Sequence, residues 1–192
     1  LVQEGFRPSN LLHLSQALSQ RWELEGFYQL SRASDVTENC STFFSQPDYV
    51  AQGCSDNLAV LRTRQQVLTQ YGQPALDTLQ GLGVNWNTPD EGGLVRRGED
   101  QQASESGQFG LALHYFAEAL DTHFGLYAVH VHSRQAYLGI RAPDQPTYSA
   151  AQVEGALAPR VVAGNSQYFM GYPEDLQTYG LSFSSQLGLG RT

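Results

Sequence analysis

Alternation of apolar and polar side chains with a period of two, interrupted by connections of alternating length, is the feature that most limits how this chain can fold. The alternating runs lie at residues 12–18, 22–30, 109–119, 126–132 and 176–189. Tight turns, near Ser19-Gln20 and Asp121-Thr122, join the first to the second run and the third to the fourth. Because every second junction of an antiparallel sheet falls at the same end, the tight turns are expected at one end and the long connections at the other.

This pattern predicts an all-β fold, an antiparallel meander with short turns and long loops. Outer-membrane β-barrels have this asymmetry, with short periplasmic turns and long external loops. An antiparallel sandwich with extended loops accounts for the same pattern. In the barrel interpretation residues 1–192 form a single β-barrel segment. Residues 32–107 are then a long external loop with a short helix near 58–70, and residues 134–170 are a second long external loop.

The amino-acid composition excludes several classes of protein. The formal net charge of the 192 residues is −8, and all 11 basic residues are arginine, with no basic cluster beyond Arg96-Arg97. Nucleic acid is therefore not an expected partner. No stretch of the sequence is long and apolar enough for a transmembrane helix. The two cysteines exclude a zinc ribbon and a disulfide-dense small domain.

Four segments resemble the domain-of-unknown-function 1302 family of proteobacterial outer-membrane proteins. The most specific is Tyr172-Pro173-Glu174-Asp175, which continues to Phe183. The other three are Leu24-Glu25-Gly26-Phe27-Tyr28-Gln29-Leu30, Thr42-Phe43-Phe44-Ser45-Gln46-Pro47-Asp48-Tyr49-Val50 with Gly53-Cys54, and Gly110-Leu111-Ala112-Leu113-His114-Tyr115-Phe116. They occur in the family's order over nearly the whole chain.

The resemblance implies a large barrel in the cell outer membrane, in contact with its lipid. Family members are much longer, so this chain is similar to an internal stretch of one. Five strands cannot close a membrane barrel, because eight is the smallest known number. Such proteins are often encoded beside a second family of unknown function and membrane exporters of lipid-like cargo. The resemblance thus implies a small hydrophobic molecule as cargo and a periplasmic partner protein.

Cys40 and Cys54 lie in the first long connection and would close a loop of about fifteen residues. A disulfide there would contribute roughly 3 kcal/mol in the loop-entropy model. A redox or metal-binding pair is the alternative. A structural disulfide is favoured, because no histidine is close in sequence and the context indicates an oxidising compartment.

Six ionisable residues are expected on polar strand faces that line the barrel interior: Glu23, Glu25, His114, Glu118, His130 and His132. The His-x-His spacing of His130 and His132, with His114 on a facing strand, also fits a metal site. Glu23 and Glu25 could form a pair for acid–base chemistry. The simpler interpretation is that these residues are there because a barrel interior is wet.

The sequence therefore predicts an outer-membrane barrel that allows passage or export of a small hydrophobic molecule. The chain is not expected to be an enzyme or to bind a metal or cofactor. A soluble secreted β-sandwich that binds ligands through its loops is the alternative from another class. A metal-dependent hydrolase built on His114, His130 and His132 is the third.

Overall fold

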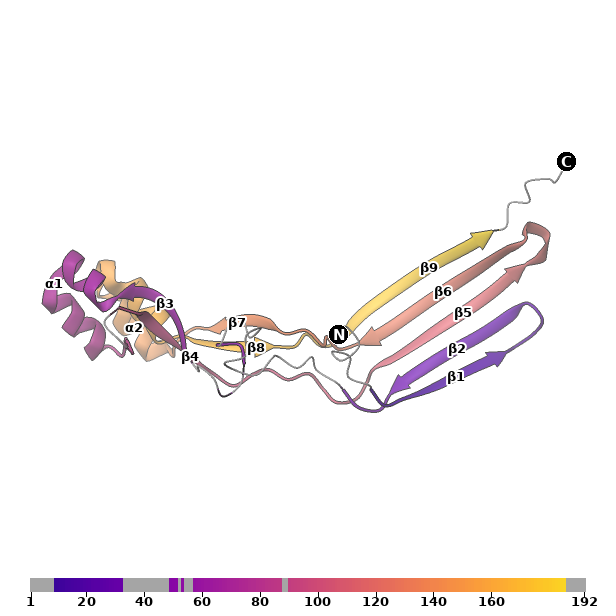
Figure 1. Cartoon of the computed structure of the whole chain (residues 1–192), viewed down its shortest axis with the longest axis horizontal. Helices are drawn as coiled ribbons and strands as arrows, with labels where there is room; N and C mark the ends of the chain where they lie inside the picture. The colour runs from indigo at the N-terminus through magenta and orange to yellow at the C-terminus, as the bar shows by residue number, and fades with distance from the viewer. Residues whose placement is uncertain (1–8, 33–48, 52, 54–56, 88–89, 186–192) are drawn as a thin grey trace. The chain divides into compact units, whose positions relative to one another are not determined.

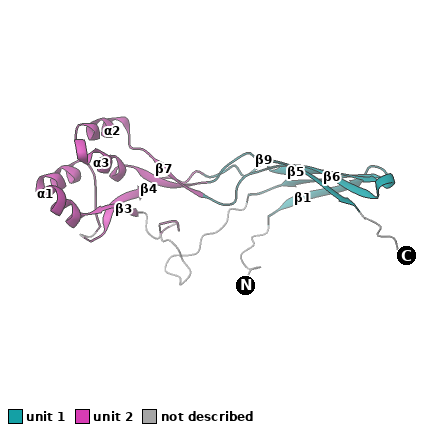
Figure 2. Ribbon diagram, turned by 90° about the horizontal axis from the view of Figure 1, so that it is seen from above, with its two compact units in different colours: residues 1–35, 102–136, 172–192 teal, residues 36–101, 137–171 magenta. Residues whose placement is uncertain are grey.

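The computed structural model describes residues 9–32, 49–51, 53, 57–87 and 90–185. The chain forms two compact units, each built from separate stretches of sequence (Figures 1 and 2). Unit 1 comprises residues 1–35, 102–136 and 172–192, and unit 2 comprises residues 36–101 and 137–171. The single segment expected over residues 1–192 is thus divided, because the two long connections form a unit of their own.

Unit 1 is one antiparallel sheet in the order β1-β2-β5-β6-β9. Its strands are β1 (Leu11–Ala17), β2 (Trp22–Gln29), β5 (Phe109–Ala117), β6 (Thr122–Val131) and β9 (Leu176–Ser185). Each lies within or close to one of the five alternating runs of the sequence. The antiparallel meander predicted from those runs is confirmed. The wider fold is mostly β rather than all-β, because unit 2 contains helices.

The two tight turns of unit 1 lie at the same end of its sheet. The Arg21 guanidinium, in the β1–β2 turn, binds both carboxylate oxygens of Glu118 at 3.1 and 2.9 Å. Glu118 begins the short helix η2 (Glu118–Leu120), which joins β5 to β6. Asp121 follows with φ of 44°, a left-handed conformation that Asp tolerates better than most residues. The expectation that short turns share one end of the sheet is therefore correct for this unit.

Unit 2 contains a four-stranded sheet in the order β3-β4-β8-β7. These strands are β3 (Asn57–Thr63), β4 (Gly92–Arg97), β7 (Tyr137–Arg141) and β8 (Gln167–Gly171). The β4–β8 pair is parallel and joins the two stretches of sequence that make up the unit; the other two pairs are antiparallel.

The described residues of unit 2 also form three α-helices: α1 (Arg64–Gly81), α2 (Gln145–Gln152) and α3 (Ala158–Gly164), with the short helix η3 (Gly155–Leu157) before α3. Thr63 and Gln66 form a reciprocal capping box at the start of α1. The helix expected near residues 58–70 therefore begins only at Arg64, because Leu58 and Leu61 belong to β3. It continues to Gly81 across a kink at Gly72, whose φ of 80° suits glycine, two residues before Pro74.

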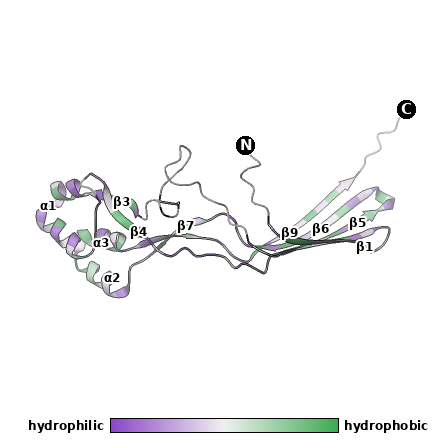
Figure 3. Cartoon of the chain, turned by 60° about the horizontal axis from the view of Figure 1, so that its bottom comes forward, coloured by the Kyte–Doolittle hydropathy of each residue, from purple (hydrophilic) through white to green (hydrophobic). Residues whose placement is uncertain are grey.

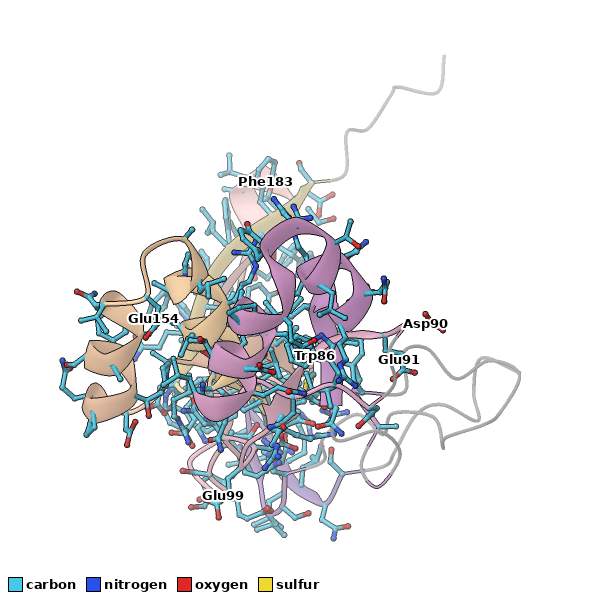
Figure 4. The ribbon with its side chains drawn as sticks, turned by 90° about the vertical axis from the view of Figure 1, so that its left-hand side faces the viewer. Trp86, Asp90, Glu91, Glu99, Glu154 and Phe183 are labelled. Carbon is cyan, nitrogen blue, oxygen red and sulfur yellow. The ribbon has the colours of Figure 1, made fainter. Side chains whose placement is uncertain are left out.

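The fully buried core of unit 2 comes from α1, the segment after it, α2 and α3: Val67, Leu76, Leu79, Val84, Ala151 and Val161. Trp86 packs against this core and donates its indole N–H to the carbonyl of Arg62 at 2.8 Å (Figure 4). Arg97 and Asp100 form a largely buried ion pair at 2.8 Å. The long connections thus contain enough apolar residues to build a core, which loop-like composition alone did not suggest.

Candidate functional site

The register of unit 1 gives its sheet two faces of different chemistry. Figure 3 shows hydrophobic and hydrophilic residues alternating along the strands. We call one side the apolar face; across the sheet it carries Leu12, Leu14, Trp22, Leu24, Tyr28, Phe109, Leu111, Leu113, Tyr115, Phe124, Leu126, Tyr179, Leu181 and Phe183. The other, the polar face, carries His13, Ser15, Glu23, Glu25, Phe27, Gly110, Ala112, His114, His123, Gly125, Tyr127, Thr178, Gly180, Ser182 and Ser184, with the apolar Phe116, Val129, Val131 and Leu176 among them.

The apolar face is widely exposed. Leu181, Phe183 and Tyr179 on β9 have exposed fractions of 73%, 74% and 76%. Leu14 on β1, at the opposite edge of the sheet, is 64% exposed. Most soluble monomers expose no continuous apolar surface that spans five strands. We therefore expect this face to be covered, either by lipid or by another protein surface.

A row of polar contacts crosses all five strands on the polar face. Ser15 on β1 donates to Glu23 on β2 at 2.8 Å, and Glu25 on β2 lies 3.9 Å from the imidazole of His114 on β5. The His114 ring meets that of Tyr127 on β6 edge to face, with 5.7 Å between centroids. The Tyr127 hydroxyl is 3.1 Å from the hydroxyl of Ser182 on β9. Each strand is therefore tied to the next by a polar side-chain or ring contact on this face.

The six residues expected to share one face are separated by the structure. Glu23, Glu25 and His114 do share the polar face. Glu118 lies outside it, in the turn between β5 and β6. His130 lies on the apolar face, where its ring packs edge to face on Phe109 with 5.3 Å between centroids. His132 follows the end of β6 and is only 5% exposed.

The six residues could not be assigned to faces from the sequence because β6 carries apolar residues on both sides. Its alternation alone does not tell which side matches the polar side of β5. The pairing of His114 with Gly125 and of Leu113 with Leu126 decides it. Tyr127 and Ser182 belong to the polar row but were not singled out from the sequence. Once the β5–β6 register is known, counting alternate residues along β6 places Tyr127 on the same face as Glu25 and His114.

A second cluster lies at the end of the sheet away from the tight turns, around residues 172–175. The backbone N–H of Asp175 donates to Nδ1 of His132 at 3.1 Å, and Nε2 of His132 lies 3.0 Å from the carbonyl oxygen of Ser106. The Asp175 carboxylate lies 3.2 Å from Nε2 of His130. The segment that gave the most specific resemblance therefore joins β9 to the residues before β5 and after β6.

Glu174 extends this cluster. Its carboxylate accepts hydrogen bonds from both the hydroxyl and the backbone N–H of Ser104. These bonds hold the pKa of Glu174 below its ordinary value, the hydroxyl having the larger effect. The neighbouring Tyr172 ring has the guanidinium carbon of Arg32 4.6 Å from its centroid. Residues 32, 104 and 172–175 are thus linked through charge, hydrogen bonds and a cation–π contact.

The three-histidine site is not assembled, since His114 and His130 lie on opposite faces. Within the described ranges no group of three or more His, Cys, Asp or Glu residues is arranged to hold a metal ion. The same ranges contain no helix that is both long and apolar enough to cross a membrane. Cys40 and Cys54, predicted as a disulfide, lie outside the described residues.

Comparison with known proteins gives one result. The sequence model of a family described as a protein of unknown function, the domain-of-unknown-function 1302 family, matches residues 1–191. The chain belongs to this family. No curated protein and no solved structure matches it. The suspected membership in the domain-of-unknown-function 1302 family is therefore confirmed.

Proposed function

We propose that this chain is a segment of an outer-membrane β-barrel that allows passage or export of a small hydrophobic molecule. The observation that carries the proposal is the division of the unit 1 sheet into two chemically distinct faces. In a membrane barrel lipid-facing and interior-facing residues alternate along each strand. Here the apolar face would contact the outer-membrane lipid, and Glu23, Glu25 and His114 would face the interior.

The alternative is a soluble secreted β-sandwich that binds ligands through its loops. In a sandwich the apolar face is buried against a second sheet, with interdigitating side chains. The described part of unit 1 has one sheet, so no second sheet of that unit covers Leu181 and Phe183, and lipid is favoured as the covering phase. The polar face supports the same choice, because it combines glycine, alanine and serine with a carboxylate and histidine row, which suits a wet interior.

The five strands described in unit 1 are too few for a membrane barrel, so the proposal requires further strands beside β1 and β9. The hydrophobic cargo is the part of the proposal that depends on the genomic setting implied by the family resemblance. A periplasmic partner protein is proposed on the same ground. No enzymatic step is proposed.

The experiment is a comparison of the native protein from washed outer membranes by gel electrophoresis, unheated and boiled. A closed barrel migrates faster before heating, so the expected result is a heat-dependent shift of a band well above 21.2 kDa. A band at 21.2 kDa in the soluble fraction with no heat shift would contradict the barrel and support the secreted sandwich.

Transport itself needs a second readout. Purified barrel reconstituted in vesicles should release a trapped small amphiphilic dye, whose charge keeps it from crossing lipid unaided, faster than empty vesicles do, and should release a large dextran no faster. Equal release of both probes would indicate a leak instead of passage through a defined interior.

A further inference from the structure

A hollow of about 220 Å³ lies on the polar face of unit 1. Glu25, Phe27 and Tyr127 line it, together with the imidazole-bearing His13 and the short residues Gly110 and Ala112. Pockets for drug-sized ligands occupy about 300–1,000 Å³, so this one suits a smaller molecule.

The hollow exists because short side chains stand between long ones in the strand register. Glu25, Ala112 and Tyr127 are cross-strand neighbours on β2, β5 and β6. Adjacent strands are about 4.8 Å apart, so Glu25 and Tyr127 stand roughly 10 Å apart across the alanine. In the next row Phe27 pairs with Gly110. A Cβ at Gly110 would lie 3.0 Å or less from three carbons of the Phe27 ring, so the ring lies directly over this glycine.

The Tyr127 ring, which forms one wall of the hollow, is held by contacts with β9 on the side away from Glu25. Its hydroxyl lies 3.1 Å from that of Ser182, and its ring covers Gly180, where a Cβ would stand 3.4 Å from Cδ2 of the ring. Both aromatic walls are therefore held by contacts that an occupant of the hollow need not supply.

The two β2 carboxylates on the polar face, Glu23 and Glu25, differ in their contacts, and only Glu25 lines the hollow. Glu23 accepts a hydrogen bond from Ser15 at 2.8 Å. Among the described residues Glu25 accepts no hydrogen bond, and its carboxylate lies 3.9 Å from Nε2 of the His114 imidazole. The Glu25 side chain is 39% exposed, so its carboxylate is accessible and bordered by aromatic rings. An aromatic wall beside an accessible carboxylate attracts a cation that carries apolar groups, as aromatic cages bind quaternary ammonium ions.

We propose that this hollow binds a small organic cation with an apolar or aromatic substituent. Glu25 supplies the counter-charge, while Phe27 and Tyr127 supply the walls for the cationic head and its substituent. The inference rests on the proposed function, because it takes the polar face to be the interior that solutes reach. It restricts the hydrophobic cargo to amphiphilic molecules bearing a positive charge.

The test is isothermal titration of the full-length native protein in detergent with benzyltrimethylammonium. Benzyl alcohol and benzenesulfonate serve as neutral and anionic probes of similar size. The expected order is measurable binding of the cation, weaker binding of the alcohol and none of the sulfonate. Glu25→Gln is expected to weaken cation binding about tenfold, and Phe27→Leu about threefold.

Glu154→Gln is the matched control, since it removes one carboxylate charge in unit 2, where that side chain makes no capping hydrogen bond. It should leave the affinity for benzyltrimethylammonium unchanged. Unchanged binding by Glu25→Gln, or equal affinities for the cation and the alcohol, would overturn the inference. Each variant is also run unheated and boiled on a gel. A retained heat shift with no cation binding refutes the hollow alone, whereas a missing shift in the unaltered protein refutes the barrel.

Discussion

The backbone N–H of Asp175 donates to Nδ1 of His132, whose Nε2 faces the Ser106 carbonyl. An N–H can only donate and a carbonyl can only accept, so these two neighbours require a neutral imidazole with its proton on Nε2. His132→Ala would leave the N–H and the carbonyl without partners in a mostly buried place. We expect a loss of about 1–3 kcal/mol.

This loss should appear as a lower temperature at which the unheated gel band converts to the boiled form. His123→Ala is the control, because that exposed ring stacks on Phe116 and makes no hydrogen bond to a described residue. An equal effect of the two substitutions would mean that the hydrogen bonds of His132 do not stabilise the strand ends.

The bonds from Ser104 to Glu174 predict a dependence on pH. The folded-state pKa of Glu174 is lowered, so the stabilisation is complete above the ordinary value of 4.5 and is lost as the pH falls through the lowered folded-state value. Hydrogen exchange of the peptide containing residues 102–108 should therefore be faster at acid pH than the intrinsic exchange rate explains. Glu174→Gln should show that faster exchange already at pH 7, where its amide has no charge to lose. Identical protection of both proteins across the pH range would contradict this.

Adjacent residues of β9 test the two faces directly. Leu181 lies on the apolar face and Ser182 on the polar face. Arginine on the lipid face of a barrel costs about 2–4 kcal/mol at the bilayer midplane, and an interior position is more tolerant. Leu181→Arg is therefore expected to reduce the amount of heat-shifted protein in outer membranes much more than Ser182→Arg does. A larger loss with Ser182→Arg than with Leu181→Arg would indicate that the polar face, and not the apolar face, contacts the lipid.

Two glycines of the polar face offer a matched pair for packing. At Gly110 a Cβ would collide with the Phe27 ring, whereas at Gly180 it would sit in ordinary contact, 3.4 Å from Tyr127. Gly110→Ala is expected to destabilise the protein by about 1–3 kcal/mol, because the ring must move. Gly180→Ala should cost little. Urea unfolding followed by the loss of heat-shifted protein measures both, and similar midpoints would show that the Phe27 ring moves freely.

In unit 2, neighbouring arginines of β4 differ in burial. Arg97 pairs with Asp100, and its guanidinium also approaches the carbonyls of Tyr49, Val50 and Ala51 at 3.1–3.4 Å. Arg96 is exposed. Arg97→Met removes the ion-pair partner of the largely buried Asp100 carboxylate, which still accepts from the backbone N–H of Met170, so we expect a cost of about 3 kcal/mol. Brief proteolysis should then cut near residues 49–51 more rapidly than in Arg96→Met. Equal cutting would show that the carbonyl contacts do not hold this segment.

The strands of unit 1 were predictable because each depends on local alternation. Leu111, Leu113 and Tyr115 mark one side of β5 without any knowledge of its neighbours. The side to which His130 points was not predictable, because it depends on the register set by the turn at Glu118–Asp121. Unit 2 was missed for a related reason. Its parallel β4–β8 pair joins residues 96–97 to residues 167–168, and no local pattern reports a pairing over that distance.

The parallel pairing of β4 with β8 closes a chain loop that runs from Arg97 to Gln167 and contains the β5–β6 hairpin. The entropy lost on closing a loop grows with the number of flexible residues in it. Once β5 and β6 have paired, much of that loop is no longer flexible, and the two halves of unit 2 meet at a smaller entropic cost. The hairpin therefore favours the folding of unit 2 through connectivity alone. A mutation that slows formation of the turn at Asp121 should therefore also slow formation of the unit 2 core, although that turn contributes no side chain to this core.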